Sequence, residues 1–575
     1  MSQPGDPHTS SLHSDWPLRP WGLAALLGLA GLGVHFLAEW NADVWAPWRA
    51  ALTAALAFGS LALAFTVDRG RWKQPLAFAA IVALIMGGIA WRVALASETH
   101  VDAPFWFAAG IVAIALALPL FQAGFHRRRW RTSYDETHFH VWTDAICVAG
   151  ALAFVGLSWL LLFLLAQLFA AIKIDVLKTL VDQGWFGWMF SGAAFGAALG
   201  VLRNQLRIIG TLQSVVMLVF SIIAVPLAVA LVIFLLAVVA SGISVLWNAT
   251  ESPTPLLLSF AAACFVLVNA VVRNGDAEAS GNRVLRWAAL VLALAILPLA
   301  LLAAISTGTR ISEYGLSPER LWGVIAVAVA VAYGVAYFIA PIRGRMAGAL
   351  AGWMDGVRTA NMHLAVGTCV LAFLLALPLF DFGAISTRNQ LARLESGAVA
   401  VEDFDFDALR WDFGDAGREA LARLAEGNDP DIADLANEAL ETEIRTYRNA
   451  ERSDERDSRL ANLRLQFEDE ALQELVIQHV RASAWRCNAP CVALDLGMGE
   501  NGKRMVALVE GGRVAQEEFD ISGPADEDAA ERAVEVATLN EVPEPDQSEG
   551  STVEIREWTG RRIYIDGKPA GQPFE

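Results

Sequence analysis

Charged residues are scarce in this chain of 575 residues, because Asp, Glu, Lys and Arg make up only 18% of the sequence. Soluble domains carry about a quarter of such residues. With 55% hydrophobic residues, this composition excludes a disordered or nucleic-acid-binding protein and disfavours an ordinary cytosolic enzyme. Tyrosine is also rare, with 6 Tyr against 20 Trp. A Trp-rich, apolar composition indicates a membrane protein.

Several motifs of catalysis are missing as well. The sequence contains no GxSxG, no Walker A phosphate loop and no HExxH zinc motif. Charged residues are nearly absent from the middle of the apolar runs. Ion-coupled transporters generally keep some charge there, so this scarcity lowers the expectation of ion-coupled transport. No cofactor and no metal are expected.

The net charge of −18 is distributed unevenly. Residues 395–575 hold 42 Asp or Glu and 19 Lys or Arg, whereas residues 1–394 hold 19 acidic and 24 basic residues. The chain therefore has two regions that suit different solvents. The acidic tail argues against nucleic acid and against docking on anionic lipid, and its simplest role is solubility through charge repulsion.

Eleven apolar runs in the first region are long enough to cross a bilayer as helices, which needs about 20 residues. Lys and Arg gather in the loops after the even-numbered runs, with 15 there against six in and beside the other loops. Cytoplasmic loops collect these residues. We therefore expect a cytoplasmic N-terminus and a tail outside the membrane; ten or twelve runs is the alternative count. The runs are 21–38, 49–67, 75–96, 104–125, 141–171, 184–202, 211–241, 255–272, 285–306, 318–341 and 361–381.

The predicted fold is mostly α: a polytopic transmembrane helix bundle followed by a soluble helical neck and a small β-rich domain. In the neck, Asp429-Pro430 predicts a helix start, because Asp accepts from free backbone N–H groups and Pro needs none. Further along, alternating apolar residues predict strands at 492–496, 505–509, 514–519, 553–558 and 562–566. The expected segments are a polar N-terminal tail (1–20), the bundle (21–385), the neck (386–482) and the β-rich domain (483–575) with an acidic loop (522–550).

Two of the five cysteines lie in the tail. Cys487 and Cys491 bracket Asn488-Ala489-Pro490. In an oxidising compartment a local disulfide is the favoured reading, with free thiols and a metal site as alternatives. The metal site is the least favoured, because no Cys/His pair stands nearby. Cys147, Cys264 and Cys369 fall in apolar runs and are expected to be small core residues.

Two predicted outer loops, 247–255 and 310–322, contain the candidate site. The simpler reading is that they hold well-made helix starts, since Ser317 can cap a helix that Pro318 opens. In the functional reading, five side chains of these loops meet at one surface, where they bind a polar ligand or hold the tail. These five are Glu251, Arg310, Tyr314, Glu319 and Arg320.

A histidine cluster stands in a basic segment on the opposite side. His126, His138 and His140, with Asp135 and Glu136, offer metal-ligand chemistry. Such residues also gather freely in short polar loops, and we favour this reading.

Four stretches together resemble the bacterial polytopic membrane family named domain of unknown function 4153. They are 134–142, 248–259 with ATESPTPLLLS, 313–322 with EYGLSPERLW, and 386–422 with STRNQLARLESGAVAVEDFDFDALRWDFGDAGREAL. The resemblance runs from about residue 20 to the end of the chain. It implies a multi-pass protein of the bacterial inner membrane, and no reaction, substrate or catalytic residue.

The leading hypothesis is a non-enzymatic envelope scaffold or sensor that presents residues 386–575 to a periplasmic protein or ligand. A transporter is the second hypothesis, with a cavity lined by groups such as Asp144, Asn269 and Arg92. A membrane-embedded transferase acting on a lipid-linked substrate is the third, with Glu251 or Glu319 as base. A polar cavity at mid-membrane favours transport, a groove open to lipid favours a transferase, and a solid bundle favours a scaffold. The sequence does not fix an oligomeric state.

Overall fold

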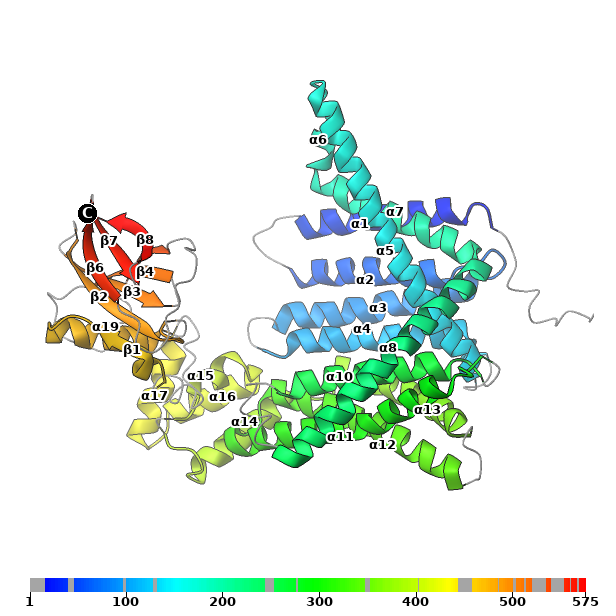
Figure 1. Ribbon diagram of the computed structural model, residues 1–575. Helices are drawn as coiled ribbons and strands as arrows, with labels where there is room; N and C mark the ends of the chain where they lie inside the picture. Colours follow the sequence, from blue (N-terminus) through cyan, green and yellow to red (C-terminus); the bar gives the residue numbers. More distant parts are fainter. Residues whose placement is uncertain are drawn as a thin grey trace, which may run out of the picture. The chain divides into compact units, whose positions relative to one another are not determined.

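A computed structural model provides the structure of the chain (Figure 1). The chain forms two compact units. The first contains residues 1–398 and 406–445, and the second contains residues 399–405 and 446–575. The structure describes residues 16–574 except 40–45, 97–99, 128–131, 243–252, 276–277, 347–351, 402, 443–457, 484–485, 500–502, 511–512, 520–533, 539–552, 559 and 566–567.

Within these residues, eleven helices are long and apolar enough to cross a membrane, which confirms the predicted number. They lie where the apolar runs were expected, because lipid requires each segment to satisfy its own backbone hydrogen bonds. A short helix, α6 (Val176–Val181), joins α5 and α7. The spans are α1 (Arg19–Glu39), α2 (Pro47–Thr66), α3 (Lys73–Ala96), α4 (Ala103–Gln122), α5 (Tyr134–Ala171), α7 (Gly184–Asn204), α8 (Leu206–Ser241), α10 (Pro253–Val272), α11 (Arg283–Tyr314), α12 (Pro318–Met346) and α13 (Gly352–Ala376).

The helices of the first unit pack around three main apolar clusters. One is formed by α8 and α10–α13, a second by α1, α2, α5, α7 and α8, and a third by α2, α3, α4, α12 and α13. Helices α1 to α4 lie side by side, and α4 also contacts α13 (Figure 1). We call the end of this bundle where α3, α11 and α13 finish the neck end.

Glycines bring α1 and α7 into backbone contact. A Cβ atom added at Gly196 would lie 2.2 Å from the carbonyl oxygen of Leu23, and one at Gly192 would lie 2.2 Å from that of Leu27. Gly31 on α1 approaches the carbonyl of Trp188 in the same way. Small residues at i and i+4 are how membrane helices approach closely in the absence of a hydrophobic driving force.

The neck begins with four helices that belong to the first unit: α14 (Phe382–Glu395), α15 (Phe406–Trp411), α16 (Gly414–Ala425) and α17 (Pro430–Glu441). Asp381 Oδ1 caps α14 by accepting from the N–H of Ala384 at 2.8 Å. Helix α17 starts at Pro430, and Asp429 caps it as expected. The four helices pack on one another through amphipathic faces.

The second unit is built on a five-stranded sheet of order β1-β2-β3-β4-β5, in which only β1 and β2 are parallel. A three-stranded antiparallel sheet follows. Helix α19 (Glu470–Ala482) packs its apolar face into the core beside Val506 and the two cysteines. The strands are β1 (Leu463–Leu465), β2 (Cys491–Met498), β3 (Arg504–Glu510), β4 (Arg513–Phe519), β5 (Val534–Thr538), β6 (Val553–Trp558), β7 (Gly560–Ile565) and β8 (Lys568–Phe574).

The structure differs from the expected organisation in two places. The segment 386–482 is shared between the units, because β1 and α19 belong to the second unit whereas α14–α17 belong to the first. Strand β5 lies inside 522–550, which the acidic composition predicted to be a loop. It pairs antiparallel with β4, with Val534 opposite Glu518.

Candidate functional site at the neck end of the bundle

The loop between α11 and α12 holds α14. The side chain of Gln390 donates to the carbonyl oxygens of Tyr314 and Leu316, at 2.9 Å each. Asn389 Oδ1 accepts from the N–H of Leu316 at 2.8 Å. Two neighbouring side chains of α14 thus bind both the carbonyl oxygens and an N–H group of the loop backbone. They fix the position of the first neck helix against the spans.

Arg393 extends this contact by one turn of α14. Its guanidinium donates to the carbonyl oxygens of Ser312 at 3.2 Å and Glu313 at 2.6 Å. Charge-assisted bonds of this kind are stronger than neutral ones. We call the contact between residues 312–316 and Asn389, Gln390 and Arg393 the loop–neck clamp.

Gly315 allows the loop to reach α14. Its φ of 73° and ψ of −171° lie in a backbone region that only glycine adopts readily. A Cβ atom here would lie 2.7 Å from Gln390 Nε2 and 3.0 Å from Asn389 Oδ1. The glycine of EYGLSPERLW is therefore required both by its backbone angles and by the side chains of the clamp.

The structure brings together only some of the five predicted outer-loop residues. Arg320 and Tyr314 lie together, since Arg320 Nη1 donates to the carbonyl oxygens of Tyr314 and Gly315 at 3.2 and 3.1 Å. Arg320 also lies over the Tyr314 ring, 5.4 Å from its centroid. Glu319 is exposed in the first turn of α12, and Arg310 lies near the end of α11. Glu251 falls outside the described residues, so the meeting of all five stays a prediction.

The neck end also holds a pocket, where α3 and α13 finish and α4 begins. It encloses about 830 Å³, within the usual range for small-molecule sites. Its wall includes apolar side chains that are exposed on the bundle surface, such as Leu84, Leu95 and Phe380. Its polar groups are Arg92, His100, Asp102, Asp381, Asp415 and Arg418.

Asp102 is the most buried charged residue of this pocket, with 2% of its surface exposed. Its Oδ2 accepts hydrogen bonds from the indole N–H groups of Trp106 at 3.1 Å and Trp322 at 3.2 Å. Its Oδ1 is buried and has no hydrogen-bond partner among the described residues. Trp322 is the last residue of EYGLSPERLW, so this motif forms one side of the clamp and also holds a carboxylate of the pocket.

Arg92 lies over the indole ring of Trp106. Its guanidinium lies 3.5 Å from the ring centroid of Trp106, a close cation–π contact. It also donates to the carbonyl oxygen of Ala376 at 3.2 Å, which ties α3 to the end of α13. The charges of Asp102 and Asp381 both act on this guanidinium.

Two of the remaining charged groups of the pocket belong to the neck. Asp415 and Arg418 form an ion pair on α16. His100 forms an isolated β-bridge with Phe413, just before α16, and its ring fills the space beside Gly414. The pocket is thus closed on one side by spans and on the other by neck helices of the same unit.

At the opposite end of the bundle, a buried polar network joins α5, α10, α12 and α13. Asn269 Nδ2 donates to the Tyr337 hydroxyl at 2.8 Å, and this hydroxyl donates to Asn361 Oδ1 at 2.7 Å. Asn361 Nδ2 returns a bond to Asn269 Oδ1 at 2.7 Å, and Tyr134 donates to the same oxygen at 3.2 Å. Because these groups satisfy one another, the network joins helices and leaves little capacity for a transported ligand.

His138 has both ring nitrogens engaged beside this network. Nδ1 forms a hydrogen bond with Asn274 Oδ1, and Nε2 accepts from the indole of Trp142 at 3.1 Å. The described residues contain no group of three or more potential metal ligands. The stretch 134–142 therefore takes part in helix packing in this structure.

The clamp, the pocket and most of the spans fall within one sequence family, whereas α1 lies before the matched residues. The family described as Domain of unknown function (DUF4153) matches residues 51–424, about two thirds of the chain. The chain belongs to this family. No curated protein and no solved structure shows significant similarity to it. The family domain contains every residue that lines the pocket and both sides of the clamp.

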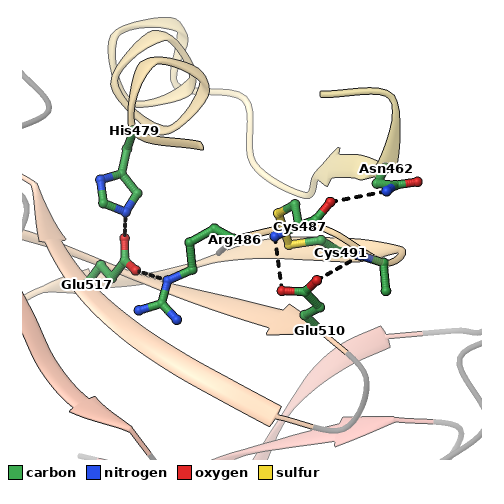
Figure 2. Close-up of a disulfide and its surroundings, with 8 residues drawn as sticks. Asn462, His479, Arg486, Cys487, Cys491, Glu510 and Glu517 are labelled. Atoms are coloured by element: carbon green, nitrogen blue, oxygen red, sulfur yellow. Dashed lines mark hydrogen bonds and ion pairs between the residues drawn. A yellow bond between two sulfur atoms is a disulfide. The ribbon is translucent and has the colours of Figure 1, made fainter. Parts of the chain in front are cut away.

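The second unit is almost entirely outside the family domain and has a distinct buried centre (Figure 2). A disulfide joins Cys487 and Cys491, which are both buried in the core under α19. Glu510 accepts from the N–H groups of Cys487 at 3.0 Å and Ala489 at 2.8 Å, so its carboxylate holds the loop that the disulfide closes. The oxidised state in cells stays a prediction.

Glu517 is a buried carboxylate in the same unit (Figure 2). Its Oε1 accepts from Arg486 Nε at 2.8 Å, and its Oε2 lies against His479 Nε2. Burial raises the pKa of Glu517, but the hydrogen bonds and charges of His479 and Arg486 outweigh burial, so its pKa is lowered from the ordinary value. The group is thus held ionised inside the domain.

Sequence reasoning missed Asp102, Trp106 and the pocket they form. The pocket joins residues from 84–106 to residues from 376–418, and no local pattern connects these segments. The three groups expected in a transport cavity are separated: of them, only Arg92 lines the described pocket. Asn269 lies in the network at the other end, and Asp144 accepts from Gln122 at 3.3 Å.

Proposed function

We infer that this family member is a non-enzymatic scaffold or sensor of the bacterial inner membrane that presents its second unit in the periplasm. The observation that carries this proposal is the loop–neck clamp. Five hydrogen bonds, all involving backbone atoms of residues 312–316, hold α14 to the spans. A helix fixed in this way can support the domain that follows it in the chain.

Two further features support the periplasmic side. Lys and Arg gather in the loops opposite the neck end, where cytoplasmic loops are expected. The cysteine pair of the second unit is placed as a disulfide, a bond that persists in oxidising compartments. Both features suit a neck end that faces the periplasm.

The scaffold proposal is tested by separating the two units in cells. A cleavage site for a specific protease, inserted at 446–457, allows an added impermeant protease to cut between them. We expect cutting in intact cells and loss of complementation of a strain that lacks the chain. An insertion with a scrambled cleavage sequence is the control. Full complementation after complete cutting would show that the bundle acts alone, as a transporter would.

The pocket is the one observation that favours the transferase alternative, because it combines carboxylates with an apolar wall. Each of its carboxylates already has a structural partner: Asp381 caps α14, Asp415 pairs with Arg418, and one oxygen of Asp102 accepts from two indoles. Glu319, the base proposed from sequence, is not among the lining residues. A transferase predicts that Asp102→Asn abolishes complementation at normal protein levels, whereas the scaffold predicts that it is retained.

A further inference from the structure

We propose that the pocket at the neck end binds the zwitterionic head group of an aminophospholipid, with the ammonium group at Asp102 and the phosphate at Arg92. This site goes beyond the scaffold function and does not depend on which side of the membrane the neck lies. The argument rests on the wall of the pocket, its charges and its unsatisfied acceptor.

The wall of the pocket suits an acyl chain. Leu84 and Leu95 on α3 are 77% and 65% exposed, and Leu379 after α13 is 59% exposed. In a membrane-spanning unit, such side chains face lipid, because no other described part of the unit covers them. A chain lying along α3 can therefore enter the pocket directly from the bilayer.

The polar end of the pocket suits a head group that carries both signs of charge. Three carboxylates and two guanidinium groups line it. The excess of negative charge favours a cation, and the guanidinium groups offer a contact for an anion beside it. Asp415 and Arg418 pair with each other, and Asp381 caps α14. Asp102 and Arg92 are the charged pair at the ends of α4 and α3, where a head group would lie.

Asp102 selects an ammonium donor. One of its oxygens accepts from two indoles, whereas the other is buried and has no hydrogen-bond partner among the described residues. An unsatisfied buried acceptor is costly, and the cost is greater for a charged group. A primary ammonium supplies hydrogen bonds and charge together, whereas a choline head group offers no N–H and a glycerol head group offers no positive charge.

Arg92 provides the anion contact. Its guanidinium has five N–H donors, of which the structure engages one with the carbonyl oxygen of Ala376. Stacking on Trp106 orients the guanidinium plane without using its donors. Guanidinium groups held in this way bind phosphate well.

The test uses the purified full chain, delipidated in detergent and titrated with short-chain phospholipids that share the same acyl chains. The head groups are ethanolamine, choline and glycerol, and binding is followed by the rise in Tm, which grows with ligand concentration relative to Kd. We expect the ethanolamine lipid to bind at least tenfold more tightly than the other two. Equal effects of all three would overturn the proposal.

Two variants locate the site. Asp102→Asn keeps an oxygen for the indoles and removes the charge, and it should weaken ethanolamine-lipid binding at least tenfold. Its control is Asp182→Asn, an exposed acid in the loop after α6. If Asp102→Asn binds like the wild-type chain, the proposal fails.

Gly88→Leu provides a second, independent variant in case Asp102→Asn folds poorly. Gly88 lines the pocket, and a Cβ atom there meets no atom within 4 Å, so a leucine begins in open space and extends into the acyl-chain site. A Cβ atom at Gly156 on α5 also meets no atom within 4 Å, and Gly156 lies outside the pocket. Gly88→Leu should abolish lipid-dependent stabilisation and Gly156→Leu should retain it. Unchanged binding in Gly88→Leu would place the lipid elsewhere.

Discussion

Replacing Gly315 by alanine should open the loop–neck clamp. The native φ of 73° with ψ of −171° costs a non-glycine residue about 1–3 kcal/mol. The new Cβ would also lie 2.7 Å from Gln390 Nε2, which must then move away from its two carbonyl acceptors. Losing those bonds adds about 1 kcal/mol, so the clamp should weaken by roughly 2–4 kcal/mol.

Hydrogen exchange of the α14 backbone amides measures this loss, because local opening controls their exchange. A change of roughly 2–4 kcal/mol corresponds to exchange about 30 to 1,000 times faster. Spans that take no part in the clamp, such as α1 and α7, should exchange as in the wild-type chain.

Gly323→Ala is the matched control. Gly323 lies in α12, and a Cβ atom there meets nothing within 4 Å. Alanine is favoured over glycine inside a helix by up to about 1 kcal/mol, so α14 should exchange no faster in this variant. If Gly315→Ala leaves α14 as protected as Gly323→Ala does, the clamp does not hold the neck.

Three further predictions concern other parts of the chain. Tyr337→Phe removes a hydroxyl that makes two buried hydrogen bonds and should destabilise the bundle by about 1–2 kcal/mol; an unchanged Tm in detergent would contradict this. Glu517 has a lowered pKa when folded, so its contribution to stability is complete above its ordinary value of 4.5 and is lost as the pH falls below it. The wild-type second unit should therefore lose stability as the pH falls below about 4.5, whereas Glu517→Gln should be less stable at pH 7 and show a weaker acid dependence, in thermal unfolding of the full chain. Gly196→Val places a side chain against the carbonyl of Leu23 and should cost about 3 kcal/mol or more by separating α1 from α7, whereas Gly210→Val, with free space around it, should leave the Tm of the bundle nearly unchanged.

The spans could be predicted from sequence because lipid imposes one requirement on all of them. A run of about 20 apolar residues has to satisfy its backbone hydrogen bonds within itself, whatever its neighbours are. The same reasoning located α17, because the cap at Asp429 and the opening proline act locally. Strands β2, β3 and β4 were visible from the alternation of apolar residues, and the structure pairs them in sequence order.

Contacts between distant segments could not be predicted in this way. Asp102 reads in the sequence as an ordinary loop acid, and its role depends on Trp322, which lies 220 residues away. Strand β5 was missed because acidic neighbours masked its alternation, and it is defined by pairing with β4. The loop after α11 was recognised as unusual, but its partner on α14 was visible only in the structure.

The side of the membrane on which the second unit lies tests the scaffold account most directly. Intact cells are treated with an impermeant thiol reagent before and after reduction, and Cys487 and Cys491 are compared with a variant in which both are serine. The account predicts labelling in intact cells that appears only after reduction, because the pair is oxidised and faces the periplasm. Labelling that requires broken cells would place the second unit in the cytoplasm and contradict the account.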